Sequence, residues 1–261
     1  MFATDPILTV HCFYQRPGGE DTAYRAESGL LEARGHRVER MEYHNDALDG
    51  ISSAQAAVRA VWNHRAAREV AQRVRATGAR LVHFHNTFPL LSPAVYAGAR
   101  REGARVIQTL YNYRLVCPGA LMLRDGAPCT ACAGRLVAWP AVRHACYRDS
   151  RAASAVVATM LRVHRSAGTW THQVDGYIAV SRFLRERMVE GGLPRERMHV
   201  KGPHLADDPG VGTHRGGFAL FVGRIAEEKG LRVLVDAWRR LPGELPLRIL
   251  GDGPLRAEIE R

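Results

Sequence analysis

Short apolar runs alternate with segments of helical periodicity along most of the chain, and this alternation limits it to few folds. The apolar runs fall at Ile7–Phe13, 37–41, 81–84, 105–109, 177–180 and 198–200. Between them, apolar residues recur three or four positions apart, which is the spacing of one helix face. These helical segments lie at 23–35, 51–75, 93–101, 151–165 and 181–190. Strands that alternate with crossover helices pair in parallel, so the pattern predicts an α/β domain with a doubly wound parallel sheet.

The alternation is interrupted once and restarts near the end of the sequence. Residues at about 111–147 are rich in cysteine, proline and glycine, which predicts an irregular insertion. A stretch at 205–217 has the composition of a linker, between a domain at 1–204 and a second α/β pattern at 218–261. The second pattern holds a strand at 218–222, a helix at 230–240 and a strand at 247–250. One βαβ unit is too little for a domain of roughly 100 to 150 residues, so we expect an incomplete, C-terminally truncated second domain.

The turn after the 218–222 strand carries two basic residues, Arg224 and Lys229. Gly223 ends the strand, and a helix-like segment follows the turn. Backbone N–H groups at the start of a helix attract an anion. An Arg guanidinium can donate two hydrogen bonds to two phosphate oxygens, and a Lys ammonium adds a localised positive charge. Lys229 is one of only two lysines among 37 basic residues, which makes its position informative. The turn therefore predicts a polyphosphate site, and an ordinary surface turn with solvated charges is the alternative.

Several motifs together resemble those of the retaining glycosyltransferases of family 4, which have the GT-B architecture of two facing Rossmann-like domains. The most specific are Val222-Gly223-Arg224 with Glu228-Lys229-Gly230, followed by Gly251-Asp252-Gly253-Pro254. The others are Gly18-Gly19-Glu20, Arg34-Gly35-His36-Arg37-Val38, Val82-His83-Phe84-His85-Asn86 and Tyr177-Ile178-Ala179-Val180-Ser181. The resemblance covers nearly the whole sequence. It implies a complete N-terminal Rossmann-like domain with a parallel sheet, plus the first βαβ unit of a second Rossmann-like domain.

The resemblance also implies an activity: transfer of a sugar, with retention, from a nucleotide-diphosphate donor to a glycan, lipid-linked or small-molecule acceptor. Such enzymes typically need no catalytic metal, because positive side chains and helix dipoles stabilise the leaving diphosphate, and we expect none. By resemblance, the donor diphosphate is bound by Arg224, Lys229, Gly223, Gly18 and Gly19. The residues on the nucleotide side are Gly251, Gly253 and Pro254.

Two departures from the family pattern bear on activity. The family's paired glutamates, which bind the donor sugar and ribose, would lie beyond Arg261, and this predicts little turnover for the chain as it stands. Tyr111 stands where the family commonly has a histidine near the reacting sugar. A phenol can donate a hydrogen bond but does not perform an imidazole's proton chemistry near neutral pH. Tyr111, at the position of the family's histidine, and the nearby His85 are the two candidate catalytic residues. The alternative to a transferase is a non-enzymatic remnant that binds a glycan or a partner.

Four cysteines gather in the insertion, at Cys117, Cys129, Cys132 and Cys146. A Cys-x2-Cys pair with two further thiolates can close a tetrahedral zinc site, which would pin an irregular loop. The spacing therefore predicts structural zinc. Unligated cysteines, a disulfide and a redox pair are the open alternatives.

The charge balance points to acidic partners. A formal net charge of +11 favours nucleotide diphosphates, anionic lipid headgroups or nucleic acid. The basic residues are scattered and the aromatic content of 7% supplies no base-stacking platform, so we expect no nucleic-acid partner. No run reaches the roughly 18 apolar residues of a membrane span, and the N-terminus lacks a signal-peptide layout. We expect a cytoplasmic protein whose contact with an anionic membrane is at most peripheral.

Overall fold

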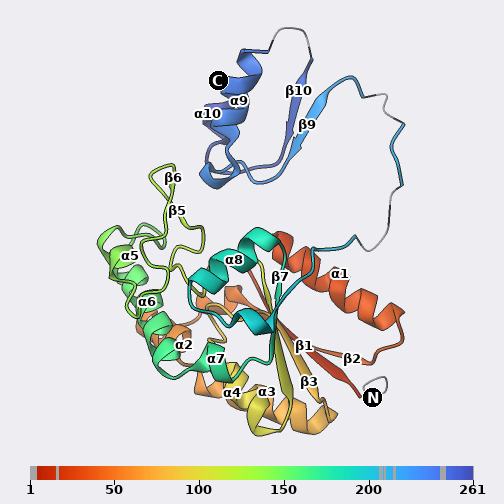
Figure 1. Ribbon diagram of the computed structural model, residues 1–261, viewed down its shortest axis with the longest axis vertical. Helices are drawn as coiled ribbons and strands as arrows, with labels where there is room; N and C mark the ends of the chain where they lie inside the picture. Colours follow the sequence, from red (N-terminus) through yellow and green to blue (C-terminus); the bar gives the residue numbers. More distant parts are fainter. Residues whose placement is uncertain are drawn as a thin grey trace. The chain divides into compact units, whose positions relative to one another are not determined.

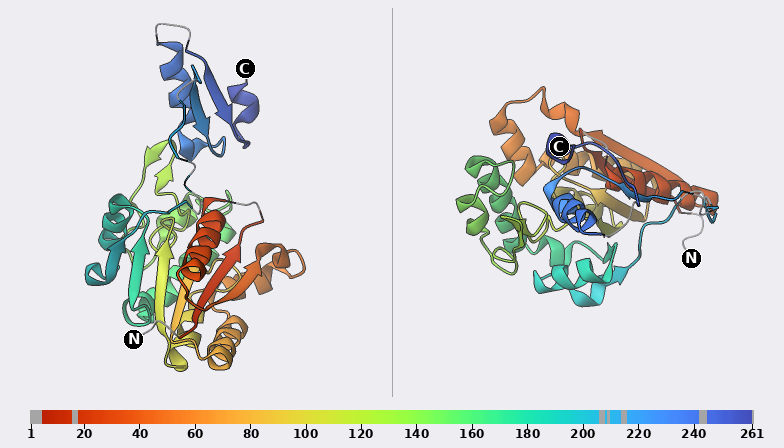
Figure 2. Two further views of the ribbon diagram at one scale, coloured as in Figure 1. Left: turned by 90° about the vertical axis from the view of Figure 1, so that its right-hand side faces the viewer. Right: turned by 90° about the horizontal axis from the view of Figure 1, so that it is seen from above.

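The structure is a computed structural model (Figures 1 and 2) that describes residues 5–15, 18–205, 208, 210–213, 216–241 and 245–260. The chain divides into two compact units, Met1–Met122 with Thr130–Ala206 and Leu123–Cys129 with Asp207–Arg261. Of the predicted linker at 205–217, residues 206–207, 209 and 214–215 lie outside the described residues. The same holds for residues 242–244 and 261 of the predicted second domain.

The first unit is built around a six-stranded parallel sheet with the strand order β2-β1-β3-β4-β7-β8. In chain order the strands are β1 Ile7–Phe13, β2 Val38–His44, β3 Leu81–Asn86, β4 Arg105–Leu110, β7 Gly176–Ala179 and β8 Met198–Val200. All neighbouring strands pair in parallel, so their carboxyl ends meet at one edge. From β1 the chain moves to one side for β2 and to the other for all later strands, which makes the position between β1 and β3 the switch point. The predicted doubly wound parallel sheet is confirmed.

Helices connect the strands in the predicted alternation. They are α1 Gly19–Ala33, α2 Ser53–Val61, α3 His64–Thr77, α4 Ala94–Arg101, α6 Arg151–Ser166, α7 Thr169–His172 and α8 Arg182–Glu190. Short 3-10 helices lie at η1 Asn45–Leu48 and η2 Arg195–Arg197. Helix α1 packs against β1, β2 and β3, whereas α4 packs against α3 and α7, and α6 packs against α2 and α7.

Local sequence sets where these helices begin. Helix α8 is capped by Ser181, whose hydroxyl accepts the N–H of Leu184 at 3.1 Å. Helix α4 begins at Ala94, one residue after the start of the predicted segment at 93–101. Ser92, just before it, has a positive φ of 56°, unlike the extended backbone of a typical capping serine.

The inner strands β1, β3 and β4 are largely buried on both sides, as in other parallel sheets, whereas the edge strands β2 and β8 are partly exposed. Apolar side chains with no exposed surface include Leu8, Val10, Cys12, Val82 and Phe84. Buried polar side chains alternate with them, namely Thr9 and His11 on β1 and His83 and His85 on β3. Buried polar groups are unusual and therefore informative, and these lie on the two strands that flank the switch point.

The predicted insertion at 111–147 holds little regular structure. It contains α5, at Trp139–Arg143, and an antiparallel hairpin of β5 (Leu123–Arg124) and β6 (Ala127–Pro128). The hairpin belongs to the second unit. Val116 and Ala138 have no exposed surface, so the rest of the insertion contributes to the core of the first unit.

The second unit pairs β9 (Ala219–Val222) in parallel with β10 (Leu247–Leu250). Between them lie η3 (Glu227–Lys229) and α9 (Leu231–Arg239), and α10 (Arg256–Ile259) follows β10. The predicted strand-helix-strand order is confirmed, with one added 3-10 turn before the helix.

None of the helices in the described part of the chain combines the length and the apolar character that a membrane crossing requires.

Candidate functional site

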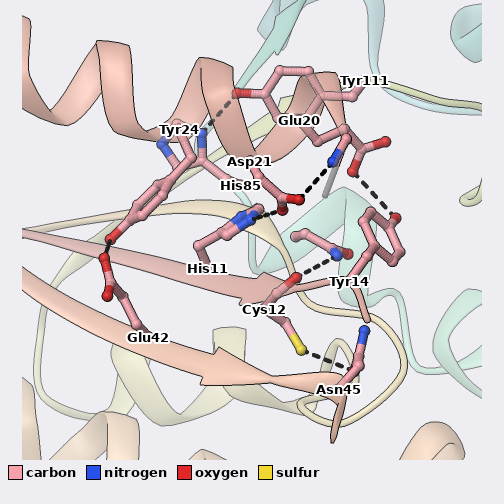
Figure 3. A network of polar contacts seen from close by, with 12 residues as sticks. His11, Cys12, Tyr14, Glu20, Asp21, Tyr24, Glu42, Asn45, His85 and Tyr111 are labelled. Atoms are coloured by element: carbon pink, nitrogen blue, oxygen red, sulfur yellow. Dashed lines mark hydrogen bonds and ion pairs between the residues drawn. The ribbon is translucent and has the colours of Figure 1, made fainter. Parts of the chain in front are cut away.

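A polar pocket lies at the carboxyl edge of the sheet in the first unit. Its walls come from the ends of β1, β3 and β4, the first turn of α1 and the start of the insertion. The lining residues are Tyr14, Glu20, His85, Asn86, Thr87, Phe88, Tyr96, Gln108, Thr109, Leu110, Tyr111, Asn112, Arg114 and Leu115. Because ligands of doubly wound sheets bind at this edge, near the switch point, the pocket is the candidate functional site. Figure 3 shows several of its residues with the hydrogen-bond network behind them.

Both predicted catalytic candidates, His85 and Tyr111, line this pocket and contact each other. His85 Nδ1 lies 2.8 Å from the Tyr111 hydroxyl, and Figure 3 draws this contact as a dashed line. Phe84 of β3 pairs with Gln108 of β4, so the parallel register brings the residues that follow them to the same edge of the sheet. Their catalytic roles stay predictions.

The His85–Tyr111 pair is uncharged near neutral pH. His85 is 2% exposed, and burial lowers its pKa well below the usual value, with neighbouring histidines and Lys201 adding to the decrease. Burial likewise raises the pKa of Tyr111, and the carboxylates of Glu27 and Glu20 raise it further. The Nε2 atom of His85 is buried without a hydrogen-bond partner among the described residues.

Glu20 lines the same pocket from the first turn of α1. Its carboxylate accepts a hydrogen bond from Asn112 Nδ2 at 2.7 Å and another from the Tyr14 hydroxyl at 3.2 Å. Burial raises the pKa of Glu20, while these two hydrogen bonds and the charge of Arg114 lower it in part. In the sequence, Glu20 belongs to the Gly18-Gly19-Glu20 motif, which by itself predicts no role for this carboxylate. Its place directly after two glycines was the available signal.

Arg114 contributes a positive charge to the pocket wall. Its guanidinium lies over the rings of Phe88 and Tyr147, 4.5 and 4.9 Å from their centroids, and donates to the carbonyl of Pro118. Burial lowers the pKa of Arg114, and nearby ionisable groups oppose the decrease. The pocket thus offers an acid, a guanidinium, amides and hydroxyls, which suits a ligand rich in hydroxyl groups.

The double-glycine turn is held by the buried Asp21 carboxylate. His11 Nε2 lies 2.7 Å from Asp21 Oδ1, a contact that Figure 3 draws as a dashed line. Asp21 Oδ2 accepts the N–H of Gly18 at 2.8 Å. A Cβ atom on Gly18 or Gly19 would meet nothing within 4 Å. Packing therefore does not demand glycine at either position, and the backbone of the turn is left open to a ligand.

A second, smaller pocket lies beside the first, with Thr109 and Tyr111 in both walls. It is also lined by Glu27 of α1 and by Lys201, which follows β8. Lys201 Nζ donates to Glu27 Oε1 at 3.0 Å.

The predicted donor-binding residues of the second unit lie on two adjacent turns. The N–H of Gly223 donates to the carbonyl of Leu250 at 3.0 Å, and the N–H of Ile225 donates to the carbonyl of Asp252 at 2.9 Å. A Cβ atom on Gly251 would lie 1.9 Å from the carbonyl oxygen of Gly223. Gly251 is therefore required by close backbone packing of the two turns.

Gly253 is under the same constraint, since a Cβ atom added to it would lie 2.3 Å from the carbonyl oxygen of Ile225. Pro254 follows on the same turn.

The two cations of the predicted donor site are accessible to solvent. Lys229 is exposed, and the Arg224 side chain is 62% exposed and pairs with Glu228. Binding of a diphosphate by this group stays a prediction.

The insertion cysteines divide between the units. Cys132 is buried, Cys117 and Cys146 are partly buried, and all three pack against the core of the first unit. Cys132 Sγ lies 3.9 Å from the carbonyl oxygen of Ala138. Cys129 belongs to the second unit. Zinc binding by the four residues stays a prediction.

Comparison with known proteins gives structural matches only. Neither a family model nor a curated protein sequence matches the chain. The apo form of the lipopolysaccharide outer core galactosyltransferase WaaB matches with a TM-score of 0.52 and 12% identity, over 98% of this chain and 63% of that one. HepE of Anabaena in complex with UDP matches with a TM-score of 0.53 and 13% identity, over 97% of this chain and 62% of that one. The fold is GT-B.

The GT-B match confirms the predicted fold class. A further structure of HepE, in complex with UDP-glucose, matches with a TM-score of 0.52 and 14% identity, over 95% of this chain and 60% of that one. The chain therefore spans about three fifths of the length of these structures. At 12–14% sequence identity, the structural likeness establishes the fold alone.

Proposed function

We propose that the protein is a retaining glycosyltransferase of family 4, which moves a sugar from a nucleotide-diphosphate donor to an acceptor hydroxyl. One observation carries the proposal: Glu20, His85 and Tyr111 converge in one polar pocket at the carboxyl edge of a GT-B sheet, beside the open Gly18-Gly19 backbone. The acceptor occupies this pocket, where Glu20 accepts the hydrogen bond of the attacking hydroxyl.

The donor is a nucleotide sugar. Arg224 and Lys229 bind its diphosphate, with the backbone of Gly223, Gly18 and Gly19. The turn that carries Gly251, Gly253 and Pro254 lies on the nucleotide side. The complexes of HepE with UDP and with UDP-glucose support a uridine nucleotide as the first donor to test.

In the proposed reaction, the bond between the anomeric carbon and the diphosphate oxygen breaks, and a bond to the acceptor oxygen forms on the same face of the sugar. The acceptor proton passes to the departing phosphate oxygen. Positive side chains stabilise the leaving diphosphate, so no catalytic metal is required for this step. Because burial lowers the pKa of His85, its imidazole is a weak base, and its role is to orient the Tyr111 hydroxyl.

The acceptor is a glycan, a lipid-linked sugar or a small molecule. Exposed apolar residues in the insertion, Leu136 and Trp139 among them, support a lipid-linked acceptor reached by peripheral contact with an anionic membrane. A cytoplasmic location and a structural zinc ion bound by the insertion cysteines belong to the same proposal. Metal analysis of the purified protein tests the zinc, and its absence at stoichiometric amount would remove that part.

Titration with UDP tests the donor site. Lys229→Ala leaves a phosphate charge uncompensated, so we expect its affinity for UDP to fall by about tenfold or more. Arg239→Ala on α9 removes another exposed cation of the second unit and serves as the matched control. Equal UDP affinity in wild type and Lys229→Ala would remove Lys229 from the donor site.

A non-enzymatic glycan-binding protein is the alternative, and the polar pocket of the first unit is the observation that favours it. Such a protein would bind an oligosaccharide without affinity for any nucleotide sugar. Calorimetric titration with both ligand classes separates it from the transferase.

A further inference from the structure

Two histidines of β3 and one glutamate of α1 form a cluster of metal-ligand type. Each of Glu27, His83 and His85 offers one ligand atom, and these atoms lie within 4.8 Å of one another. Both histidines are buried, with 5% and 2% exposure, and Glu27 is partly buried. In a strand, residues two apart point to the same side of the sheet, which explains why His83 and His85 face the same helix.

Each imidazole is already oriented through one ring nitrogen. His83 Nε2 lies 2.7 Å from the Thr109 hydroxyl, and His85 Nδ1 lies 2.8 Å from the Tyr111 hydroxyl. Histidines that bind metals usually engage their other ring nitrogen in such a contact, which fixes the tautomer and the ring. Both hydroxyls come from the strand β4 and its end, so the sheet register supplies this support.

His85 gives the second, independent observation. Its Nε2 atom is buried and has no hydrogen-bond partner among the described residues. Leaving a buried polar atom without a partner destabilises the fold, and a bound ion would satisfy it.

Lys201 is the competing cation. Its ammonium group donates to Glu27 Oε1 at 3.0 Å, and its side chain is 42% exposed, against 13% for Glu27. The lysine can therefore withdraw into solvent while Glu27 stays in place. A carboxylate also has two oxygens, so it can hold both cations, although the like charge of Lys201 would weaken the binding of an ion.

We propose that Glu27, His83 and His85 bind a divalent transition-metal ion of the Zn²⁺ class. Two imidazole nitrogens and one carboxylate oxygen suit Zn²⁺ and its neighbours Co²⁺ and Ni²⁺, whereas Mg²⁺ and Ca²⁺ prefer oxygen ligands alone. Three protein ligands leave a coordination position open for water or another small oxygen ligand. The site is separate from the insertion cysteines, and the sugar transfer proposed above does not depend on it.

The test compares two substitutions that break the same ion pair. Glu27→Gln removes a ligand and the ion pair, whereas Lys201→Gln removes only the ion pair and the repulsion. The full chain is freed of metal with a chelator and titrated with ZnCl₂ by calorimetry. We expect the wild type to show a Zn²⁺ site, in addition to any at the insertion cysteines, that Glu27→Gln weakens by about tenfold or more and that Lys201→Gln keeps or tightens.

Titration with Co²⁺ distinguishes this site from the cysteines. A site made of nitrogen and oxygen ligands gives visible d–d absorption without the near-ultraviolet charge-transfer band of a thiolate complex. We expect Glu27→Gln to lose the former and leave any thiolate band unchanged. Equal binding in the wild type and Glu27→Gln would overturn the proposal, and so would equal weakening in both variants, because the ion pair alone would then explain the effect.

Discussion

At the residue scale, Glu20 shows how position changes the chemistry of a common side chain. A carboxylate in the first turn of a helix usually lies in water, where it complements the helix dipole. Here Asn112 and Tyr14 hold Glu20 in the pocket wall, and burial raises its pKa. A carboxylate that is more basic than usual is also a stronger hydrogen-bond acceptor, which suits it to orient an attacking sugar hydroxyl.

Glu20→Gln keeps the size of the side chain and removes its basicity. If Glu20 binds the attacking hydroxyl, we expect transfer from UDP-glucose to fall by about 100-fold or more, with unchanged affinity for UDP. Release of UDP in the presence of a panel of sugar acceptors measures the rate. Glu32→Gln, on the same helix but paired with Arg40 at the surface, is the control and should retain the wild-type rate. A full rate in Glu20→Gln would exclude the role.

Only some of the side-chain contacts in the site can be predicted from the sequence. His85 and Tyr111 follow strands whose order and approximate bounds are visible as apolar runs, so their meeting at one edge is foreseeable from a parallel sheet. The contact of Glu20 with Asn112 joins residues 92 positions apart and depends on the exact placement of α1 against β4. The cluster of Glu27 with His83 has the same origin. Neither contact produces a periodic pattern that can be recognised in a single sequence.

At the element scale, helices α3 and α4 meet at a glycine. A Cβ atom on Gly98 of α4 would lie 2.1 Å from the carbonyl oxygen of Ala67 on α3. Real atoms do not approach so closely, so the two helix backbones can pack at this distance only while position 98 is glycine.

Gly98→Ala should therefore force α3 and α4 apart and lower the free energy of unfolding by about 1–3 kcal/mol. Gly29→Ala is the matched control, because Gly29 also lies within a helix and has nothing within 4 Å of its Cβ position. That substitution should raise the free energy of unfolding by about 0.5–1 kcal/mol, since alanine favours helix more than glycine does. Urea denaturation of the three proteins measures both effects, and a loss of stability in both variants would contradict the packing argument.

Helix α6 is joined to its neighbours by a buried histidine. His164 Nε2 lies 2.9 Å from the carbonyl oxygen of Val61 at the end of α2, and His164 Nδ1 lies 2.9 Å from the Thr169 hydroxyl on α7. Burial lowers the pKa of His164 to about 4, and the hydrogen bond to Val61 opposes this in part. The folded protein keeps this imidazole neutral at pH values where the unfolded chain protonates it.

Acid pH therefore destabilises the folded protein through His164. Between about pH 6.5 and pH 4 the unfolded state binds a proton that the native state does not, so stability is complete above that window and falls as the pH decreases through it. His164→Gln should reduce the stability lost between about pH 7.5 and pH 5 by about 2 kcal/mol. Urea denaturation at both pH values measures the difference, and the exposed residue His172 provides the control substitution to glutamine. An unchanged pH dependence in His164→Gln would show that another group titrates.

At the scale of the whole molecule, we expect the net charge of +11 and the exposed apolar residues of the insertion to act together at an anionic membrane. Trp139 is 50% exposed and Leu136 is 55% exposed, within a protein that carries many arginines. An anionic membrane attracts the charge, and its interface accepts partly inserted indole and aliphatic groups. Neither feature alone gives stable attachment, because single apolar side chains contribute little and surface charge is screened by salt.

Sedimentation with vesicles tests this combination. We expect the protein to bind vesicles that contain phosphatidylglycerol, to bind neutral phosphatidylcholine vesicles weakly, and to lose binding as the salt concentration rises. Trp139→Ser should weaken binding by about tenfold, because it removes one interfacial aromatic group without changing charge. Val58→Ser on α2 removes a similarly exposed apolar side chain outside the insertion and should have no effect. Equal weakening in both variants would mean that the insertion is not the membrane-facing segment, and binding insensitive to salt would exclude the electrostatic contribution.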